Sequence, residues 1–197
     1  IASIHSGRLD GFAGRTIADL ARAEGCEAVD LFLDLLRDEG GGIEVVIAAI
    51  GEDDIRRVMR NPSVAVASDG WTLSPDAGGT PHPRSYGTFA RVLGHYSRDE
   101  RVIPIEEAVR KMTSLPAQRL GMTDRGFVRP GARADLVAFD PATVIDRATY
   151  KQPHQFCAGV HHVFVDGTEV IREGIDTGAI AGTVLRRQRD GFAQRER

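Results

Sequence analysis

Residues 64–70 read Val-Ala-Val-Ala-Ser-Asp-Gly, and this stretch decides the predicted fold. Val64 to Ala67 form a short apolar run without polar alternation, as expected of a strand buried on both faces. A second apolar, β-branched run occupies Ile43 to Ala49, and a short helix is predicted between the two, from Glu52 to about Met59. The order of strand, helix and strand predicts buried parallel strands in an α/β layer or barrel.

Amphipathic helices are predicted on both sides of this stretch. Thr16 is a predicted N-terminal cap, and Gly25 is the predicted end of that helix. A second apolar stripe repeats at helical spacing over about Glu27 to Asp38. The remaining predicted helices lie at about Tyr86 to His95, from Pro104 to about Met112, and near Ser114 with Gly121 as the C-terminal cap.

The chain becomes rich in predicted strands from about Gly126. Ala134 to Phe139 is one, and Val160 to Val165 and Glu169 to Arg172 are predicted to pair around Asp166-Gly167. An Asp-Gly pair between two apolar runs is a strong signal for a type I′ hairpin turn. We therefore expect two regions: residues 1–122, with an active-site loop at 69–88, and the β-rich residues 123–197, whose charged tail covers a surface or frays.

Composition excludes several classes of function. The chain has 197 residues, of which 42% are hydrophobic and 27% charged, so a substantial core is expected. A net charge of -3 without a basic cluster in the body of the chain disfavours nucleic-acid binding. No apolar run approaches the roughly 20 residues that a membrane span needs. Cys26 and Cys157 belong to no CxxC pattern, so a cytoplasmic protein without a disulfide framework is expected.

Asp69 follows the apolar run and precedes Gly70 and a Gly/Pro-rich stretch that extends to Pro83. In a β/α barrel the catalytic groups lie at this end of a strand, and a carboxylate there suits a general acid or base. Asp before Gly also commonly caps a turn, and a purely structural role is equally compatible with the sequence.

His82 and Arg84 lie at the end of the same stretch, so an imidazole and a guanidinium are expected near Asp69. The planar fork of Arg suits a substrate carboxylate, which Lys cannot match in geometry. A solvent-facing Arg84, or one paired with Asp69 or Asp76, is the alternative.

The other histidines are poorly arranged for a metal. His161 and His162 are adjacent on a predicted strand and face opposite sides, while His5, His95 and His154 are isolated in sequence. No HxH or HxxxH pattern occurs, and no complete metal site can be identified. The serine-hydrolase elbow, the P-loop and the dinucleotide-binding glycine pattern are absent too.

Three segments together resemble the N-acyl-D-amino-acid deacylase (D-aminoacylase) branch of the amidohydrolase superfamily. The first is Val66-Ala67-Ser68-Asp69-Gly70, and the more specific second one is H-P-R-x-x-G-T-F at residues 82–89. The third is G-x-x-x-P-G-x-x-A-D-L-V-x-F-D at residues 126–140, which marks amidohydrolases broadly. A T-x-x-P-A-x-x-L-G pattern at residues 113–121 also matches.

The resemblance implies a fold and a set of roles. Residues 1–122 would be the C-terminal portion of a (β/α)8 metal-dependent hydrolase barrel, and residues 123–197 part of a small β-sandwich. Asp69 would pass a proton from metal-bound water to the leaving amine of an N-acyl-D-amino acid. Arg84 would pair with the α-carboxylate of that substrate, and His82 would line the site. Zinc is the implied metal, with Asp69 as a possible contributor to its coordination.

The family's metal ligands, an HxH pair, a Cys and two later His, have no counterpart in this chain. The resemblance therefore implies a companion chain or a missing N-terminal barrel segment. Two alternatives stay open. A non-catalytic, amidohydrolase-like structural or binding subunit is favoured by the lack of metal ligands. A cyclic-amide hydrolase of the dihydropyrimidinase type shares the β-sandwich stretch but not H-P-R-x-x-G-T-F.

Overall fold

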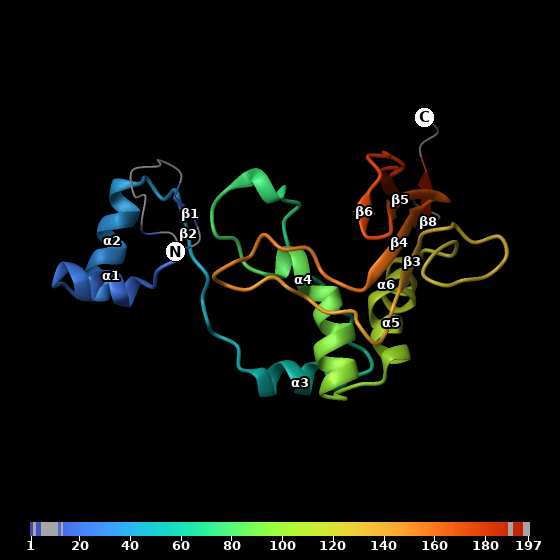
Figure 1. The fold of residues 1–197 in the computed structure, drawn as a ribbon, viewed down its shortest axis with the longest axis horizontal. Helices are drawn as coiled ribbons and strands as arrows, with labels where there is room; N and C mark the ends of the chain where they lie inside the picture. The colour runs from blue at the N-terminus through green and yellow to red at the C-terminus, as the bar shows by residue number, and fades with distance from the viewer. Residues whose placement is uncertain (2, 5–11, 13, 189–190, 195–197) are drawn as a thin grey trace. The chain divides into compact units, whose positions relative to one another are not determined.

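A computed structural model describes residues 1, 3–4, 12, 14–188 and 191–194. The chain divides into two compact units that alternate along the sequence. The first unit comprises residues 1–51, 69–87 and 147–156, and the second comprises residues 52–68, 88–146 and 157–197. Figure 1 shows a mixed α/β chain with an open sheet, which is the coarse form of the predicted fold class.

The first unit contains the predicted helical pair. α1 (Ile17–Glu24) begins where Thr16 Oγ1 accepts a hydrogen bond of 3.0 Å from the Asp19 N–H, and Gly25 ends it with a left-handed φ of 71°. α2 (Ala28–Asp38) follows and packs against α1. β1 (Ser3–Ile4) pairs antiparallel with β2 (Ile43–Glu44), and a single turn of 3-10 helix, η1 (Pro75–Ala77), lies in the long loop.

Of the two predicted parallel strands, the first is shortened and pairs antiparallel, and the second is not a strand. Only Ile43–Glu44 of the first run is a strand, and further along it Ile47 and Ile50 are 77% and 74% exposed. Residues 64–67 are not a strand either, although the Val66 N–H donates a hydrogen bond of 3.1 Å to the Lys111 carbonyl. A strand needs a hydrogen-bonded neighbouring strand, and the described part of the chain supplies none to residues 45–49 or 64–67.

The second unit has a helical half that matches the prediction closely. Its elements are α3 (Glu52–Arg60), the end of α4 (Arg84–Arg91), the π-helix η2 (Val92–Asp99), α5 (Ile105–Met112) and α6 (Ser114–Leu120). Gly121 caps α6 in the left-handed region at φ 77°, as predicted. The core of this unit is formed by Met59, Ala90, Val92, Leu93, Tyr96, Val102, Ile103, Ala108 and Val144.

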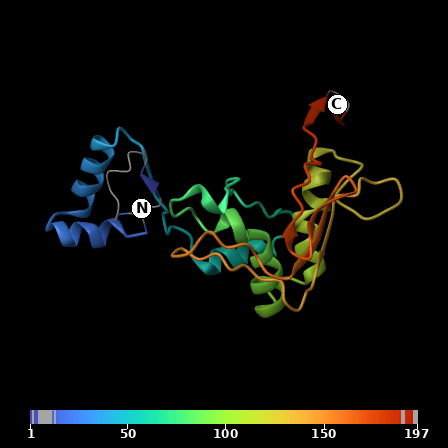
Figure 2. The ribbon, with the colours of Figure 1, turned by 45° about the horizontal axis from the view of Figure 1, so that its top comes forward.

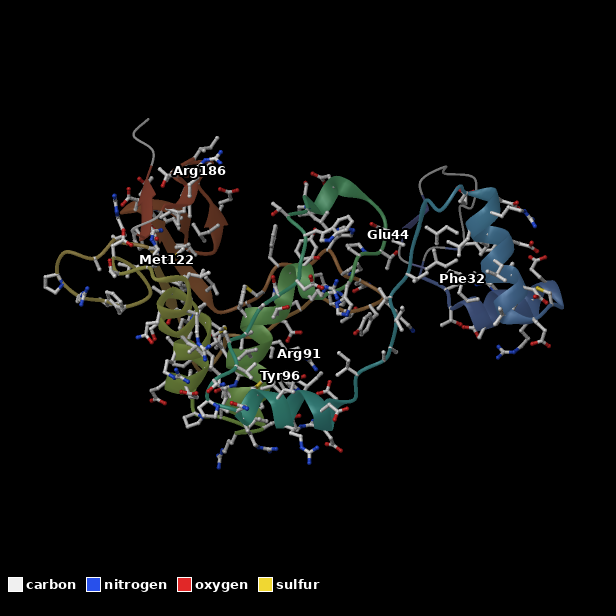
Figure 3. The ribbon with its side chains drawn as sticks, turned by 180° about the vertical axis from the view of Figure 1, so that it is seen from behind. Phe32, Glu44, Arg91, Tyr96, Met122 and Arg186 are labelled. Atoms are coloured by element: carbon white, nitrogen blue, oxygen red, sulfur yellow. The ribbon has the colours of Figure 1, made fainter. Side chains whose placement is uncertain are left out.

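The predicted helix at residues 86–95 continues as a π-helix, which the sequence did not indicate. A Cβ atom at Gly94 would lie 2.2 Å from the Val144 carbonyl oxygen, so only glycine permits this approach. Arg91 lies 5.4 Å above the centroid of the Tyr96 ring (Figure 3), and the Tyr96 hydroxyl donates a hydrogen bond of 2.8 Å to Glu52. These contacts tie the π-helix to α3.

The other half of the second unit is a four-stranded antiparallel sheet in the order β3-β4-β5-β6. Its strands are β3 (Leu136–Phe139), β4 (Val160–Val165), β5 (Thr168–Arg172) and β6 (Ile175–Asp176). Asp166 and Gly167 both have positive φ, 49° and 82°, as the predicted type I′ turn requires. Figures 1 and 2 show this sheet beside α5 and α6.

The charged tail differs from its prediction, because β7 (Leu185–Gln188) and β8 (Gly191–Gln194) form a separate antiparallel pair. No helix in the described residues is long and apolar enough to cross a membrane. His5, predicted to be isolated, lies outside the described residues.

Among the described residues, Lys111 is the one charged side chain that is fully buried. Its substitution tests what stabilises the second unit. Its ammonium group donates to the carbonyl oxygens of Asn61 and Val64, at 2.8 Å in the second case. Burial lowers the pKa of Lys111, while nearby Glu107 opposes this shift. We expect Lys111→Met to lower the free energy of unfolding by about 1–3 kcal/mol, because it removes the hydrogen bonds of a buried ammonium group to the carbonyl oxygens of Asn61 and Val64.

Urea unfolding followed by circular dichroism measures this loss. The exposed Lys151 provides the matched control, since Lys151→Met removes the same charge from a side chain that is not buried. Equal stability of the two variants would show that the Lys111 hydrogen bonds contribute nothing measurable.

Candidate active site

Asp69 begins the long loop in a backbone conformation that is unusual for its residue type. Its φ is 48°, in the left-handed region, where non-glycine residues are uncommon and Asp and Asn are the usual exceptions. Residues held in this region are often found at functional sites. The Asp69 side chain is 85% exposed, so its carboxylate is accessible.

Arg84, the first residue of α4, contacts Asp69 twice. Its Nη2 atom lies 2.9 Å from Oδ2 of Asp69, and its Nε donates a hydrogen bond of 2.9 Å to the Asp69 carbonyl oxygen. One side chain therefore holds both the backbone and the carboxylate of the loop's first residue. Of the alternatives that the sequence left open for Arg84, pairing with Asp69 is the arrangement observed.

His82 is held on both sides of its ring. Nδ1 accepts a hydrogen bond of 3.0 Å from the Arg84 N–H, and Nε2 lies 3.2 Å from the Tyr150 hydroxyl. Burial lowers the pKa of His82, the positive charge of Arg84 lowers it further, and Asp69 has the opposite effect. His82 is thus a neutral ring at pH 7, and because Nδ1 is an acceptor, the proton is on Nε2.

The start of the loop packs tightly against the start of α4. A Cβ atom at Gly70 would lie 2.8 Å from the Ser85 Cα atom, so a side chain there would push the two backbones apart. The Trp71 N–H donates a hydrogen bond of 3.3 Å to the Ser85 hydroxyl. Both ends of the Gly/Pro-rich stretch are therefore joined at the first turn of α4.

Sequence reasoning missed three side chains beside the loop: Tyr86, Tyr150 and His154. The Tyr86 hydroxyl lies 2.9 Å from His154 Nδ1, and His154 Nε2 lies 3.1 Å from the Gly79 carbonyl oxygen. The partners Tyr86 and His154 are separated by 68 positions, as are His82 and Tyr150. No local spacing signal connects residues so far apart, so His154 was read as isolated.

Metal ligands are not gathered anywhere in the described part of the chain, where no group of three or more His, Cys, Asp and Glu side chains could hold an ion. His162 instead lies 2.8 Å from a carboxylate oxygen of Glu169 through Nδ1. Asp69 alone does not make a metal site, and the other described residues do not complete one around it.

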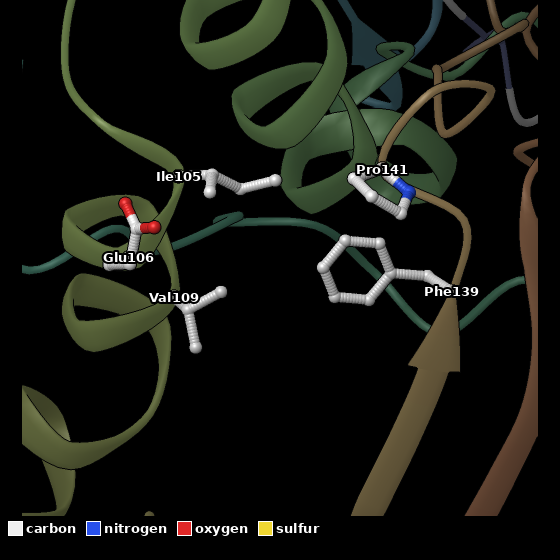
Figure 4. Close-up of a pocket in the computed structure, with 5 residues that line it drawn as sticks. All are labelled: Ile105, Glu106, Val109, Phe139 and Pro141. Atoms are coloured by element: carbon white, nitrogen blue, oxygen red, sulfur yellow. The ribbon is translucent and has the colours of Figure 1, made fainter.

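A shallow groove of about 410 Å³ lies in the second unit between α5 and the end of β3 (Figure 4). Its lining is apolar except for Glu106, and consists of Ile105, Glu106, Val109, Phe139 and Pro141. Asp69, His82 and Arg84 do not line it, so the groove adds nothing to the chemistry of the loop.

The chain is similar to known amidohydrolases. The sequence model of the Amidohydrolase family matches residues 4–171. The D-aminoacylase of Alcaligenes xylosoxydans xylosoxydans is 42% identical over 175 residues, which are 89% of this chain and 34% of that protein. The N-acyl-D-glutamate deacylase of the same organism is 41% identical, over 88% of this chain and 34% of its own length.

Solved structures agree with the sequence comparison. A D-aminoacylase described as defining a novel subset of amidohydrolases superposes with a TM-score of 0.78 at 42% identity, over 88% of this chain and 35% of its own. An N-acyl-D-glutamate deacylase from Bordetella bronchiseptica, complexed with zinc and a phosphonate inhibitor, gives 0.70 at 41% identity, over 79% and 31%. The chain thus spans about a third of the length of these relatives. Because the family model covers most of its residues, the chain belongs to the amidohydrolase family.

Proposed function

We propose that this chain is part of a metal-dependent amidohydrolase that cleaves N-acyl-D-amino acids to a carboxylate and a free D-amino acid. The contact of Arg84 with Asp69 carries the proposal, because it joins a carboxylate-binding group to a proton-transfer group. Support comes from relatives named D-aminoacylase and N-acyl-D-glutamate deacylase at 42% and 41% identity.

Asp69 acts as the proton-transfer group in this proposal. Its exposed carboxylate takes a proton from the attacking water and gives it to the leaving amine nitrogen as the amide bond breaks. A divalent metal, zinc by analogy with the Bordetella bronchiseptica relative, supplies Lewis-acid polarisation of the amide when bound. The described residues of this chain do not form its site.

Arg84 orients the substrate through its α-carboxylate, and His82 lines the site beside it. The carbon that bears this carboxylate also bears the amide nitrogen, so a carboxylate bound by Arg84 brings the scissile bond close to Asp69. A fixed distance of this kind lowers the entropic part of the barrier. The incoming carboxylate competes with Asp69 for the same guanidinium.

The remaining metal ligands come, in this proposal, from a companion chain or an N-terminal barrel segment. Residues 1–122 then belong to a (β/α)8 barrel with its active-site loop at 69–88, and residues 123–197 to a β-sandwich. The exposure of Ile47 and Ile50 supports this, because such β-branched segments are usually covered. A cytoplasmic location stays a prediction.

A non-catalytic, amidohydrolase-like structural or binding subunit is the second candidate. The observation in its favour is that the described residues gather no metal-binding group. Metal analysis of the purified native particle separates the two, since a particle without metal and without a companion polypeptide is expected only for the second candidate.

Asp69→Asn tests the proton-transfer role. Asn keeps the size of the side chain and tolerates the left-handed backbone, so the fold is preserved. In the complete, zinc-loaded enzyme we expect kcat/KM for N-acetyl-D-amino acids to fall by about 10²–10⁴-fold. Release of free amino acid measures it, and Asp76→Asn in the same loop is the control. A variant that retained more than a tenth of the activity would exclude Asp69 from this role.

Arg84→Lys tests carboxylate recognition. Lysine keeps the charge but loses the planar fork, so we expect KM to rise by about 10-fold or more with a smaller change in kcat. N-acyl-D-amino-acid amides, which lack the carboxylate, serve as the matched substrates. If the variant weakened binding of the amides and the acids equally, Arg84 would not be the carboxylate-binding group.

The protonation of His82 can be tested by its pH dependence without an enzyme assay. Burial lowers its pKa below the ordinary value of 6.5, so the folded chain resists protonation of this ring. The stabilisation is complete above the unfolded pKa and is lost as pH falls below it. Histidine NMR should give a titration midpoint for His82 below 6.5. Stability should also fall less between pH 7 and pH 5 in His82→Gln than in the unmodified chain, and a midpoint at or above 6.5 would contradict the partly buried, neutral ring.

A further inference from the structure

Residues 147–156 form a segment between β3 and β4 that belongs to the first unit, together with residues 69–87, which contain the long loop and the start of α4. We call these residues the crossing segment. In Figure 1 the orange chain of this segment runs beside the green chain that precedes α4. Two of its side chains, Tyr150 and His154, make polar contacts with the loop and with α4.

His154 bridges the middle of the loop to α4. A carbonyl oxygen only accepts, so His154 Nε2 carries the proton and donates to Gly79 at 3.1 Å. With the proton on Nε2, Nδ1 is an acceptor, and the Tyr86 hydroxyl donates to it at 2.9 Å. The Tyr86 ring also makes T-shaped contacts with the rings of His154 and Phe156, and its centroid lies 5.6 and 5.8 Å from theirs. These partners fix the ring orientation of His154.

Tyr150 contacts the other end of the loop through His82. Because His82 Nδ1 accepts the Arg84 N–H, its Nε2–H donates to the Tyr150 hydroxyl oxygen at 3.2 Å. The two rings meet edge to face with centroids 5.1 Å apart. The Arg84 N–H lies in the first turn of a helix, where donors lack an intrahelical acceptor, and His82 Nδ1 accepts from it. Tyr150 therefore holds the His82 ring, and this ring accepts the N–H of Arg84, the residue that pairs with Asp69.

We propose that Tyr150 and His154 are positioning residues of the deacylase site, and that the crossing segment holds the loop so that Arg84 stays aligned with Asp69. This inference rests on the proposed function. The loop is rich in glycine and proline and carries only one short turn of its own, η1, so ordering it has a large entropic cost. The crossing segment supplies fixed partners at Gly79 and His82, close to the middle and the end of the loop.

Positioning and simple stabilisation differ in their kinetic effects. A misaligned Arg84 weakens binding of a substrate carboxylate, so KM rises while kcat changes little. A merely destabilised protein has a smaller folded fraction, which lowers kcat and leaves KM unchanged. The effect on KM should also vanish with N-acyl-D-amino-acid amides, because they lack the group that Arg84 binds.

The test uses Tyr150→Phe and His154→Ala in the complete, zinc-loaded enzyme. Tyr150→Phe keeps the ring contact and removes only the hydroxyl, so it remains informative if His154→Ala folds poorly. Tyr96→Phe is the matched control, because it also removes one tyrosine hydrogen bond, of 2.8 Å to Glu52, but in the second unit. Amide hydrogen exchange of residues 70–83 and nitrogen-15 NMR of the histidines are measured on the same proteins.

We expect amide exchange in residues 70–83 to become about tenfold faster in both variants and not in Tyr96→Phe. KM for the acids should rise by a similar factor with kcat within about twofold, and His82 and His154 of the unmodified protein should both carry their proton on Nε2. Unchanged loop exchange, a proton on Nδ1 of either ring, or a fall in kcat without a change in KM would overturn the inference. If the complete enzyme releases no amino acid, the proposed function fails, while exchange and tautomer still decide whether the crossing segment orders the loop.

Discussion

The hydrogen bonds between the long loop and the first turn of α4 are the constraint on which the candidate site depends. Arg84 reaches back to Asp69 through its side chain, and its own N–H is satisfied by His82. Ser85 accepts a hydrogen bond from Trp71 at the other end of the loop. A helix start has donors that need partners, and here the loop provides them. The same contacts that complete the helix thus bring a carboxylate, an imidazole and a guanidinium together.

Local signals in the sequence were sufficient for the helices and the hairpin, because caps and turns depend on a few adjacent residues. Thr16, Gly25 and Gly121 act at the helix ends as predicted, and Asp166-Gly167 makes the expected turn. Only Ile43–Glu44 of the strand predicted at residues 43–49 is a strand, and residues 64–67 are not one, since an apolar run does not reveal whether a neighbouring strand exists. The sequence does not predict the π-helix, and the close approach of its Gly94 to Val144 joins residues too far apart for a local signal to reveal.

The candidate site shows the same division between local and distant information. Asp69, His82 and Arg84 could be found because they flank one loop, whereas Tyr150 and His154 reach it from 68 to 75 positions away. The division of the chain near residue 122 stays a prediction. The compact units alternate along the sequence, so the crossing segment returns to the first unit after β3. Substrate orientation and metal binding then come from different parts of the polypeptide in the proposed enzyme.

The left-handed backbone at Asp69 has a consequence for redesign of the site. At φ 48° a side chain branched or extended close to the backbone is strained, by roughly 1–2 kcal/mol for most residues other than Gly, Asn and Asp. Replacing Asp69 by the longer acid Glu therefore strains the backbone, and this strain offsets any benefit of placing the carboxylate farther from the main chain. Directed evolution toward bulkier or more distant substrates has little freedom to exchange this group, and will have to vary the loop around it instead.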